Sequence, residues 1–154
     1  MLYGKNVVLG VSGGIAVYKA CEIVSRLKKL GANVDVIMTD NAREFVTPLT
    51  FQTLAKSAVV TNAFEPVKEF DINHISLAKK ADIFVVAPAT ANVIAKFAEG
   101  IADDMLTTTY LASNAQKLIC PAMNCNMYED ETTQNNMRTL KDRGALFCDS
   151  AIGL

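Results

Sequence analysis

The sequence predicts a doubly wound α/β fold, in which helices cover both faces of one parallel sheet. Short runs rich in β-branched residues alternate with segments whose apolar residues recur at helical spacing, the pattern of repeated βαβ units. The runs at 6–11 and 82–88 are almost wholly apolar, as expected for strands that are buried on both faces. A length of 154 residues suits one domain, and no repeat or linker divides the chain. We therefore predict a single-domain three-layer sandwich of the Rossmann or flavodoxin type.

The strands are predicted at residues 6–11, 33–39, 58–64, 82–88, 117–122 and 145–148. Between the first two strands, apolar residues from Ile15 to Leu30 recur mostly at helical spacing, and Gly31 supplies a C-terminal stop. This right-handed connection should bring the second strand beside the first. Further helices are predicted near 41–55, 74–80, 90–99, 102–113 and 127–143. The final stretch ALFCDSAIGL has no closing helix, so the last strand is either a sheet edge or the chain is cut short.

Composition and charge exclude several classes of protein. The formal net charge is −1, apolar residues make up 51% and charged residues 20%, which argues against disorder and against electrostatic binding of nucleic acid. No apolar run approaches the length of a membrane span, and glycine interrupts the first apolar run too soon for a signal peptide. We therefore expect a cytoplasmic protein that binds neither nucleic acid nor a membrane.

The cysteine pattern favours neither a metal site nor a disulfide framework. The four cysteines, Cys21, Cys120, Cys125 and Cys148, form no CxxC pair, and the single histidine, His74, lies far from them in the sequence. Thiols of cytoplasmic proteins are kept reduced. We therefore expect no metal, and expect Cys21, Cys120 and Cys148 to be buried as small hydrophobic residues.

Candidate ligand-binding residues follow the predicted strands, because open parallel sheets bind ligands at the carboxyl ends of their strands. The stretch GVSGGIA is a glycine turn that opens a helix, so its backbone N–H groups can hold a phosphate. Its spacing matches neither the dinucleotide fingerprint nor the nucleoside triphosphate loop, which favours a phosphate monoester. Gly13 and Gly14 are also compatible with a simple tight turn.

Two further strand ends carry short polar side chains. After the second strand, Thr39 and Asn41 can bond a ligand or cap a helix, and Asp40 is compatible with binding the ribose of a dinucleotide. After the fourth strand, small residues allow a flat ligand to approach, and Thr90 and Asn92 can bond its edge. An ordinary helix N-cap is the alternative for that segment.

His74 and Asn124 are the candidate catalytic residues. His74 begins a predicted helix, where an imidazole that titrates near neutrality can hold a carboxylate or move a proton, although a structural role is the alternative. Asn124 follows the fifth strand, and its amide can bond a substrate carboxylate without adding a charge.

Three ordered motifs resemble one family of flavoproteins. GVSGGIAVYKA, HISLAKKADIFVVAPATANVIAK and PAMNCNMY are similar to the enzymes that oxidatively decarboxylate a C-terminal cysteine. They are most similar to the N-terminal half of the bifunctional phosphopantothenoylcysteine decarboxylase and phosphopantothenate–cysteine ligase of coenzyme A biosynthesis. The most specific motif is PxMNxxM followed by an aromatic residue, filled here by Pro121, Met123, Asn124, Met127 and Tyr128.

The resemblance implies FMN as the cofactor and a trimer as the assembly. Residues implied around the phosphate and ribityl chain are Gly13, Gly14, Ile15, Thr39 and Asn41, and Ser12 is a further candidate. Those implied along the flavin are Thr90, Ala91, Asn92, Val93 and Ala122. In the family the flavin lies between subunits of a trimer, and bifunctional members form dodecamers.

The implied reaction is FMN-dependent oxidative decarboxylation of phosphopantothenoylcysteine towards phosphopantetheine. Oxidation of the thiol gives a thioaldehyde, whose C=S group accepts the electrons released with carbon dioxide. His74 is implied as the acid/base group and Asn124 as the carboxylate-binding residue. Two alternatives stay open: a decarboxylase of peptides that end in cysteine, whose members commonly have Trp where Tyr128 stands, and a catalytically idle FMN-binding regulatory subunit.

The family's substrate flap, with a cysteine that protonates the final intermediate, would follow Leu154, as would the ligase domain. The expectation from the sequence is therefore a fragment, or a chain whose ligase part is separate. A chain without the flap is expected to accumulate the enethiol product.

Overall fold

Six parallel strands form the central sheet of the computed structural model, which describes residues 1–61, 74–148 and 151–153. Their spatial order is β3-β2-β1-β4-β5-β6, the doubly wound order in which the strand sequence reverses between β1 and β4. A short further strand, β7, pairs with the carboxyl end of β5. The strand bounds are β1 (Asn6–Val11), β2 (Asn33–Met38), β3 (Val59–Val60), β4 (Ile83–Ala89), β5 (Gln116–Asn124), β6 (Leu146–Phe147) and β7 (Ala151–Gly153).

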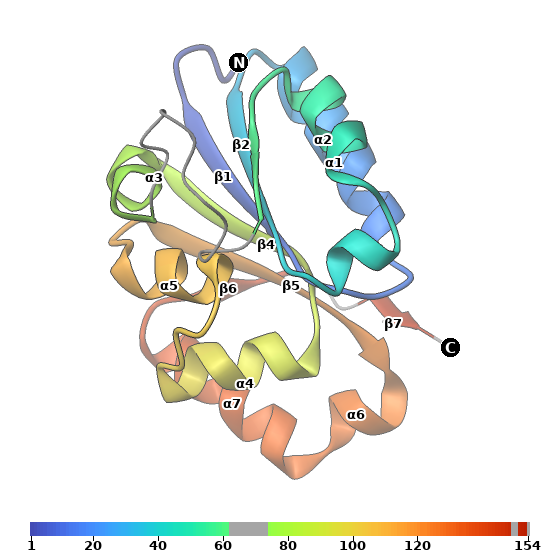
Figure 1. The fold of residues 1–154 in the computed structure, drawn as a ribbon. Coiled ribbons are helices and arrows are strands. Elements are labelled where there is room, and N and C mark those ends of the chain that lie inside the picture. The colour runs from blue at the N-terminus through green and yellow to red at the C-terminus, as the bar shows by residue number, and fades with distance from the viewer. Residues whose placement is uncertain (62–73, 149–150, 154) are drawn as a thin grey trace.

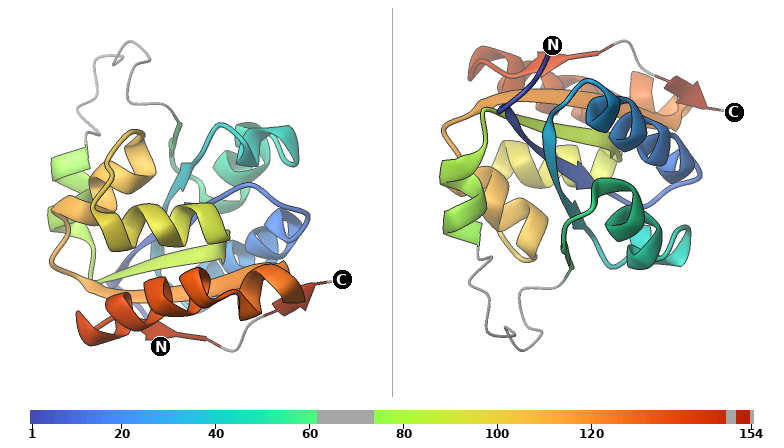
Figure 2. Two further views of the ribbon diagram at one scale, coloured as in Figure 1. Left: turned by 90° about the horizontal axis from the view of Figure 1, so that it is seen from below. Right: turned by 90° about the horizontal axis from the view of Figure 1, so that it is seen from above.

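Helices cover both faces of this sheet (Figure 1). One face carries α1 (Val17–Lys29) and α2 (Pro48–Ala55), which pack against each other. Figure 2 shows the other helices grouped on the opposite face. They are α3 (His74–Lys80), α4 (Ala91–Glu99), α5 (Met105–Ala112), α6 (Cys125–Glu129) and α7 (Glu131–Asp142). The predicted three-layer α/β class is therefore confirmed.

The first strand shows why its sequence is continuously apolar. Val7 and Leu9 belong to the core cluster on the α1 side of the sheet, whereas Val8 belongs to the cluster on the α4 and α5 side. Alternate residues of a strand point to opposite faces. Since both faces are covered by helices, every position from Val7 to Val11 is buried, and no polar alternation appears among them.

Two predicted helices are interrupted. The helix expected over 41–55 is divided into a 3-10 turn, η1 (Ala42–Glu44), and α2, because Pro48 begins α2 and holds Thr47 in an extended conformation. The helix expected over 127–143 is divided into α6 and α7, because Asp130 leaves the helical conformation and caps α7.

The remaining predicted elements are present, but the strand predicted at 145–148 is observed only at Leu146–Phe147, and β7 was not predicted. Helix α3 spans the predicted residues 74–80, and β1 spans the predicted 6–11. The third predicted strand is observed at Val59–Val60, and residues 62–64 of that prediction lie outside the described part of the chain. Among the described helices, none combines the length and apolar character that crossing a membrane requires.

The expectation that Cys120 and Cys148 are reduced is wrong for this structure, in which their sulfur atoms are bonded. The pairing of Ile119 with Phe147 places the two cysteines at adjacent positions of β5 and the end of β6, with Cα atoms 5.0 Å apart. This separation lies within the range that a disulfide requires. Cys21 and Cys125 are free thiols; Cys21, expected to be buried, is only partly buried, and Cys125 is exposed.

Candidate functional site

Ser12 joins the carboxyl ends of β1 and β4 at the point where the strand order reverses. Its Oγ donates a hydrogen bond to the Pro88 carbonyl at 2.6 Å and accepts one from the Thr90 N–H at 3.0 Å. Its own N–H also donates to the Pro88 carbonyl, at 3.2 Å. Ser12 is 2% exposed, so these bonds form in a shielded position. The hydroxyl therefore fixes the two loops that border the site.

Gly13 allows the loop after β1 to lie directly against the loop after β2. A Cβ atom at this position would stand 2.5 Å from the Asn41 Cβ and 2.9 Å from the Asn41 carbonyl carbon. At Gly14 a Cβ would meet no atom within 4 Å. The first glycine is therefore required by close packing, whereas the second faces open space.

The turn that opens α1 presents a set of unused backbone donors. The N–H groups of residues 13–16 donate to no acceptor within the described part of the chain. The N-cap, Ala16, has no side chain that could satisfy them. Since helix N-termini carry a partial positive charge, this turn is suited to bind an anion such as a phosphate.

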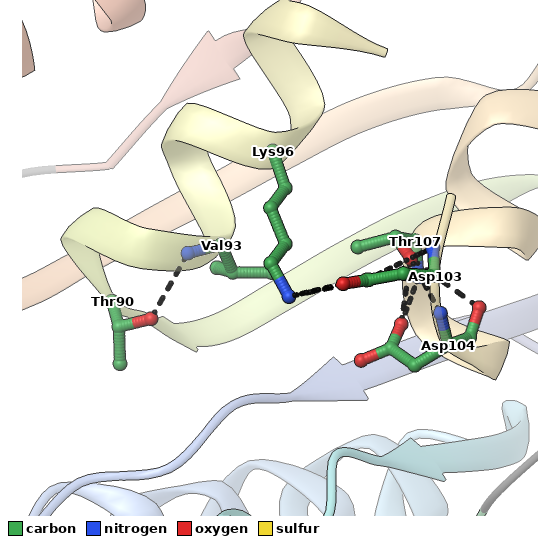
Figure 3. Close-up of polar contacts among 6 residues, drawn as sticks. All are labelled: Thr90, Val93, Lys96, Asp103, Asp104 and Thr107. Carbon is green, nitrogen blue, oxygen red and sulfur yellow. Dashed lines mark hydrogen bonds and ion pairs between the residues drawn. The ribbon is translucent and has the colours of Figure 1, made fainter. Parts of the chain in front are cut away.

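A cavity of about 340 Å³ lies beside this turn. The amino end of α4 borders it, where the Thr90 side chain accepts a hydrogen bond from the Val93 N–H at 3.2 Å (Figure 3). The side chain of Thr39 accepts from the Ala42 N–H at 3.2 Å and so caps η1. The described lining consists of Ser12, Gly13, Thr39, Asp40, Asn41, Thr90, Asn92, Val93, Lys96, Asp103 and Asp104.

An ion pair closes the far side of this first cavity. Figure 3 shows Lys96 reaching from α4 to Asp103 in the loop before α5, with Nζ 2.9 and 3.1 Å from the two carboxylate oxygens. The hydrogen bond from Lys96 holds the pKa of Asp103 below its usual value. Asp104 caps α5, accepting a hydrogen bond from the Thr107 N–H at 2.8 Å. The carboxylates on this side are thus engaged by neighbouring donors, which reduces their repulsion of an anion.

A second cavity of about 400 Å³ adjoins the first at Gly13. It lies between the turn that opens α1 and the carboxyl end of β5, and its wall is more apolar. The described lining consists of Gly13, Gly14, Ile15, Ala16, Tyr18, Lys19, Pro88, Ala122, Met123 and Asn124. Two adjoining cavities of this size can hold an elongated ligand with a polar end and a flat apolar end.

Asn124 is the last residue of β5 and the N-cap of α6. Its Oδ1 accepts a hydrogen bond from the Met127 N–H at 2.9 Å. This bond fixes the amide, and among the described residues the Nδ2 group donates to no partner, so its two donors remain for a ligand. Because Asn124 also lines the second cavity, those donors are available to a carboxylate there.

His74 is the first residue of α3, and its side chain lies outside the described part of the structure. Helix α3 packs against α5. In Figures 1 and 2 it lies at the opposite edge of the molecule from α6. Within one chain, the helix that carries His74 is therefore remote from the helix that Asn124 caps.

Comparison with known proteins places this arrangement in a family. The profile of the Flavoprotein family matches residues 1–153. The chain belongs to the Flavoprotein family. The coenzyme A biosynthesis bifunctional protein CoaBC of Bacillus subtilis strain 168 is 52% identical to this flavoprotein over 153 residues, which are 99% of this chain and 38% of that protein. CoaBC of Escherichia coli K12 is 46% identical over 145 residues, which are 94% of this chain and 36% of that protein.

This flavoprotein therefore spans less than half the length of these curated relatives. A solved structure with a similar fold is that of the FMN-dependent cysteine decarboxylase SpaF, with a TM-score of 0.88 and 32% identity. The match covers 96% of this chain and 85% of that one.

All of the predicted cofactor residues of this flavoprotein line one of the two cavities, except Ala91. Their grouping differs from the expected one. Thr90, expected beside the flavin, shares the first cavity with Thr39, whereas Ile15, expected near the phosphate, lies in the second with Ala122.

Sequence reasoning missed several lining residues of this flavoprotein, namely Tyr18, Lys19, Lys96, Asp103 and Asp104. For Lys96 a signal was present, because it stands four positions after Asn92 and so shares its helix face. For Asp103 none was present, since only the packing of α5 beside α4 brings it to the cavity.

Proposed function

We propose that this flavoprotein binds FMN and catalyses the oxidative decarboxylation of phosphopantothenoylcysteine in coenzyme A biosynthesis. Two findings support the proposal: the identity of 52% to a CoaBC protein and the similarity of fold to an FMN-dependent cysteine decarboxylase. The observation that carries it is the turn at residues 13–16, whose unused N–H groups border two adjoining cavities at the switch point of the sheet.

The residues present fit FMN. The unused N–H groups of residues 13–16 would bond the phosphate, and the positive end of α1 would stabilise its charge. Gly13 lets the loop after β2 lie against this turn, since a side chain there would collide with Asn41. Thr39 and Asn41 would bond the ribityl chain, and Ile15 and Ala122 would contact the flavin ring.

Bound flavin would supply the two-electron oxidation of the substrate thiol. The part of this chain in the reaction is to bind the substrate and to move protons. The Asn124 Nδ2 group would hold the carboxylate that leaves, with its direction set by the hydrogen bond from Met127 N–H to Oδ1. His74 would act as the acid/base group that assists thiol oxidation or positions the carboxylate.

We also propose that the complete site forms between subunits of a homotrimer. Large apolar side chains lie exposed beside the second cavity: Ile15 is 77% exposed, Tyr18 59% and Met127 45%. Large apolar side chains exposed on one part of the surface favour association. The separation of α3 from α6 in Figures 1 and 2 supports a site in which one copy supplies His74 and its neighbour supplies Asn124.

The relatives' description as bifunctional supports a second catalytic partner, a phosphopantothenate–cysteine ligase carried as a further domain or as a separate subunit. In such an assembly the trimers would associate into a dodecamer.

Mixing two inactive variants tests the shared site. His74→Asn removes the acid/base group, and Asn124→Asp keeps the cap acceptor but places a negative charge against the substrate carboxylate. Each variant alone should bind FMN, shown by the yellow absorbance and quenched fluorescence, and should release no carbon dioxide. Subunit exchange between the two should restore partial activity, because some sites then combine an intact His74 with an intact Asn124.

The same assay separates the alternatives. No recovery on mixing, with exchange shown by mass spectrometry, would overturn the shared site. Faster turnover of a peptide that ends in cysteine than of phosphopantothenoylcysteine would overturn the proposed substrate. Bound FMN without turnover of either compound would indicate the idle regulatory subunit.

A further inference from the structure

A third cavity, of about 460 Å³, lies at the amino end of β5, at the opposite end of that strand from the proposed flavin site. It is bordered by the loop from α5 to β5 and by the turn from α7 to β6. Since β5 begins here at Gln116 and ends at Asn124 in the second cavity, the two sites are about 26 Å apart along the strand. The described lining consists of Phe97, Tyr110, Leu111, Ser113, Asn114, Ala115, Gln116, Lys117, Leu140, Arg143, Gly144 and Ala145, and it includes no Asp or Glu.

Lys117 brings a positive charge into this cavity. Its ammonium group donates to the Ser113 carbonyl at 2.9 Å and lies 4.4 Å from the centre of the Tyr110 ring. Among the described residues it forms no ion pair with a carboxylate. Partial burial lowers the pKa of Lys117, as expected for an ammonium group that is removed from water without a counter-charge.

Arg143 adds a second positive charge at the rim. One guanidinium nitrogen, Nη1, donates to the Ala98 carbonyl at 3.0 Å. In the part of the chain that the structure describes, the other N–H groups of this guanidinium have no acceptor. A guanidinium with free donors is suited to carboxylates and phosphates.

Tyr110 provides a directed hydrogen-bond donor. Its ring is stacked on Phe97, with centroids 3.8 Å apart, and meets Phe84 edge-on at 5.7 Å, so the side chain is fixed. Tyr110 is 8% exposed, yet its hydroxyl has no hydrogen-bond partner among the described residues and the side chain lines the cavity. Burial raises the pKa of Tyr110 to about 12, so the hydroxyl keeps its proton and can donate it.

We propose that this third cavity binds an oxyanion, the phosphate or carboxylate group of a small organic molecule. Lys117 and Arg143 supply the charge, and the Tyr110 hydroxyl donates a hydrogen bond that fixes one oxygen. The volume exceeds what an inorganic anion fills, which leaves room for the organic part of a phosphate monoester or carboxylic acid. This site is independent of the proposed decarboxylase activity, since none of its lining residues belongs to the first two cavities.

The test is an NMR titration of the protein saturated with FMN, so that added anions do not occupy the turn at residues 13–16. Inorganic phosphate and acetate are added in separate arms at an ionic strength held constant with sodium chloride. The amide signals of Ala115, Gly144 and Ala145 should shift and saturate, whereas those of Gly13 and Gly14 should stay in place. The arm with the lower dissociation constant shows whether the natural ligand carries a phosphate or a carboxylate.

Variants make the assignment specific. Lys117→Met and Arg143→Met should each weaken phosphate or acetate binding about tenfold or more, as expected for loss of a hydrogen bond to a charged group. Tyr110→Phe should weaken it less, by about threefold to tenfold. Lys141→Met is the matched control. Lys141 lies in the last turn of α7, two residues before Arg143, but its ammonium lies over the Phe147 ring and the residue does not line the cavity.

The proposal is overturned if neither anion shifts the signals of the third cavity in the wild type. Equal weakening by Lys141→Met and Lys117→Met would also overturn it, because binding would then depend only on general surface charge. Arg143 is exposed, so its variant should stay folded and keep the test decisive even if Lys117→Met alters packing.

Discussion

Replacing Gly13 by Ala tests whether the packing of two loops holds the turn at residues 13–16 in the conformation proposed to bind an anion. The new Cβ would stand 2.5 Å from the Asn41 Cβ, 2.9 Å from its carbonyl carbon and 3.2 Å from the Ala42 nitrogen. Two of these are backbone atoms, which cannot turn aside as a flexible side chain does. Overpacking of this kind costs about 1–3 kcal/mol.

The cost must appear either in folding or in cofactor binding. If the loops stay in place, the free energy of unfolding falls by about 1–3 kcal/mol. If the turn moves to relieve the collision, FMN binding must restore it, and the affinity falls by up to about 150-fold. Urea unfolding of the FMN-free protein measures the loss in free energy of unfolding, and fluorescence titration measures the loss in free energy of FMN binding. The sum of these two losses should equal the overpacking cost.

Gly14→Ala is the matched control, because a Cβ there meets no atom within 4 Å. It should change both quantities by much less than Gly13→Ala. Unchanged stability together with unchanged FMN affinity in Gly13→Ala would refute the packing argument.

Three further predictions concern Ser12, Tyr110 and Asn124. Ser12→Ala should lower the free energy of unfolding by about 1–3 kcal/mol, because the Thr90 N–H loses its buried acceptor; an unchanged urea midpoint would contradict this. Burial raises the pKa of Tyr110 to about 12, so its contribution to stability should be intact below about pH 10 and lost as the pH rises through the folded value. The ultraviolet titration of the wild type minus that of Tyr110→Phe should show this late step, and a difference that titrates near pH 10 would count against it. Asn124→Asp should keep the cap on Met127 N–H and the fold but leave no measurable release of carbon dioxide; wild-type turnover would exclude Asn124 as the carboxylate ligand.

The sequence predicted the parts of the fold and site that depend on local pattern. The apolar run at 6–11 gave β1 because strands covered on both faces show no alternation. Gly13 and Thr90 could be predicted as site residues from local sequence too. A tight turn and a helix N-cap each require particular residue types next to a strand.

The parts that were missed depend on how helices and strands pack against one another. Asp103 reaches the first cavity only because α5 packs beside α4, and the pairing of Cys120 with Cys148 depends on the register of β5 with β6. Neither the packing of two helices nor a strand register can be read from spacing along the chain. The break before Pro48 is different, because a proline marks the start of a helix and this signal is present in the sequence itself.

Carbon dioxide released from phosphopantothenoylcysteine is the measurement that tests the proposed function most directly. The protein saturated with FMN should release it, and mass spectrometry should show a product that has lost the carboxyl group of the cysteine. His74→Asn, folded and carrying FMN, should release none. Absence of carbon dioxide with wild-type protein that is folded and holds FMN would contradict the proposed decarboxylase activity.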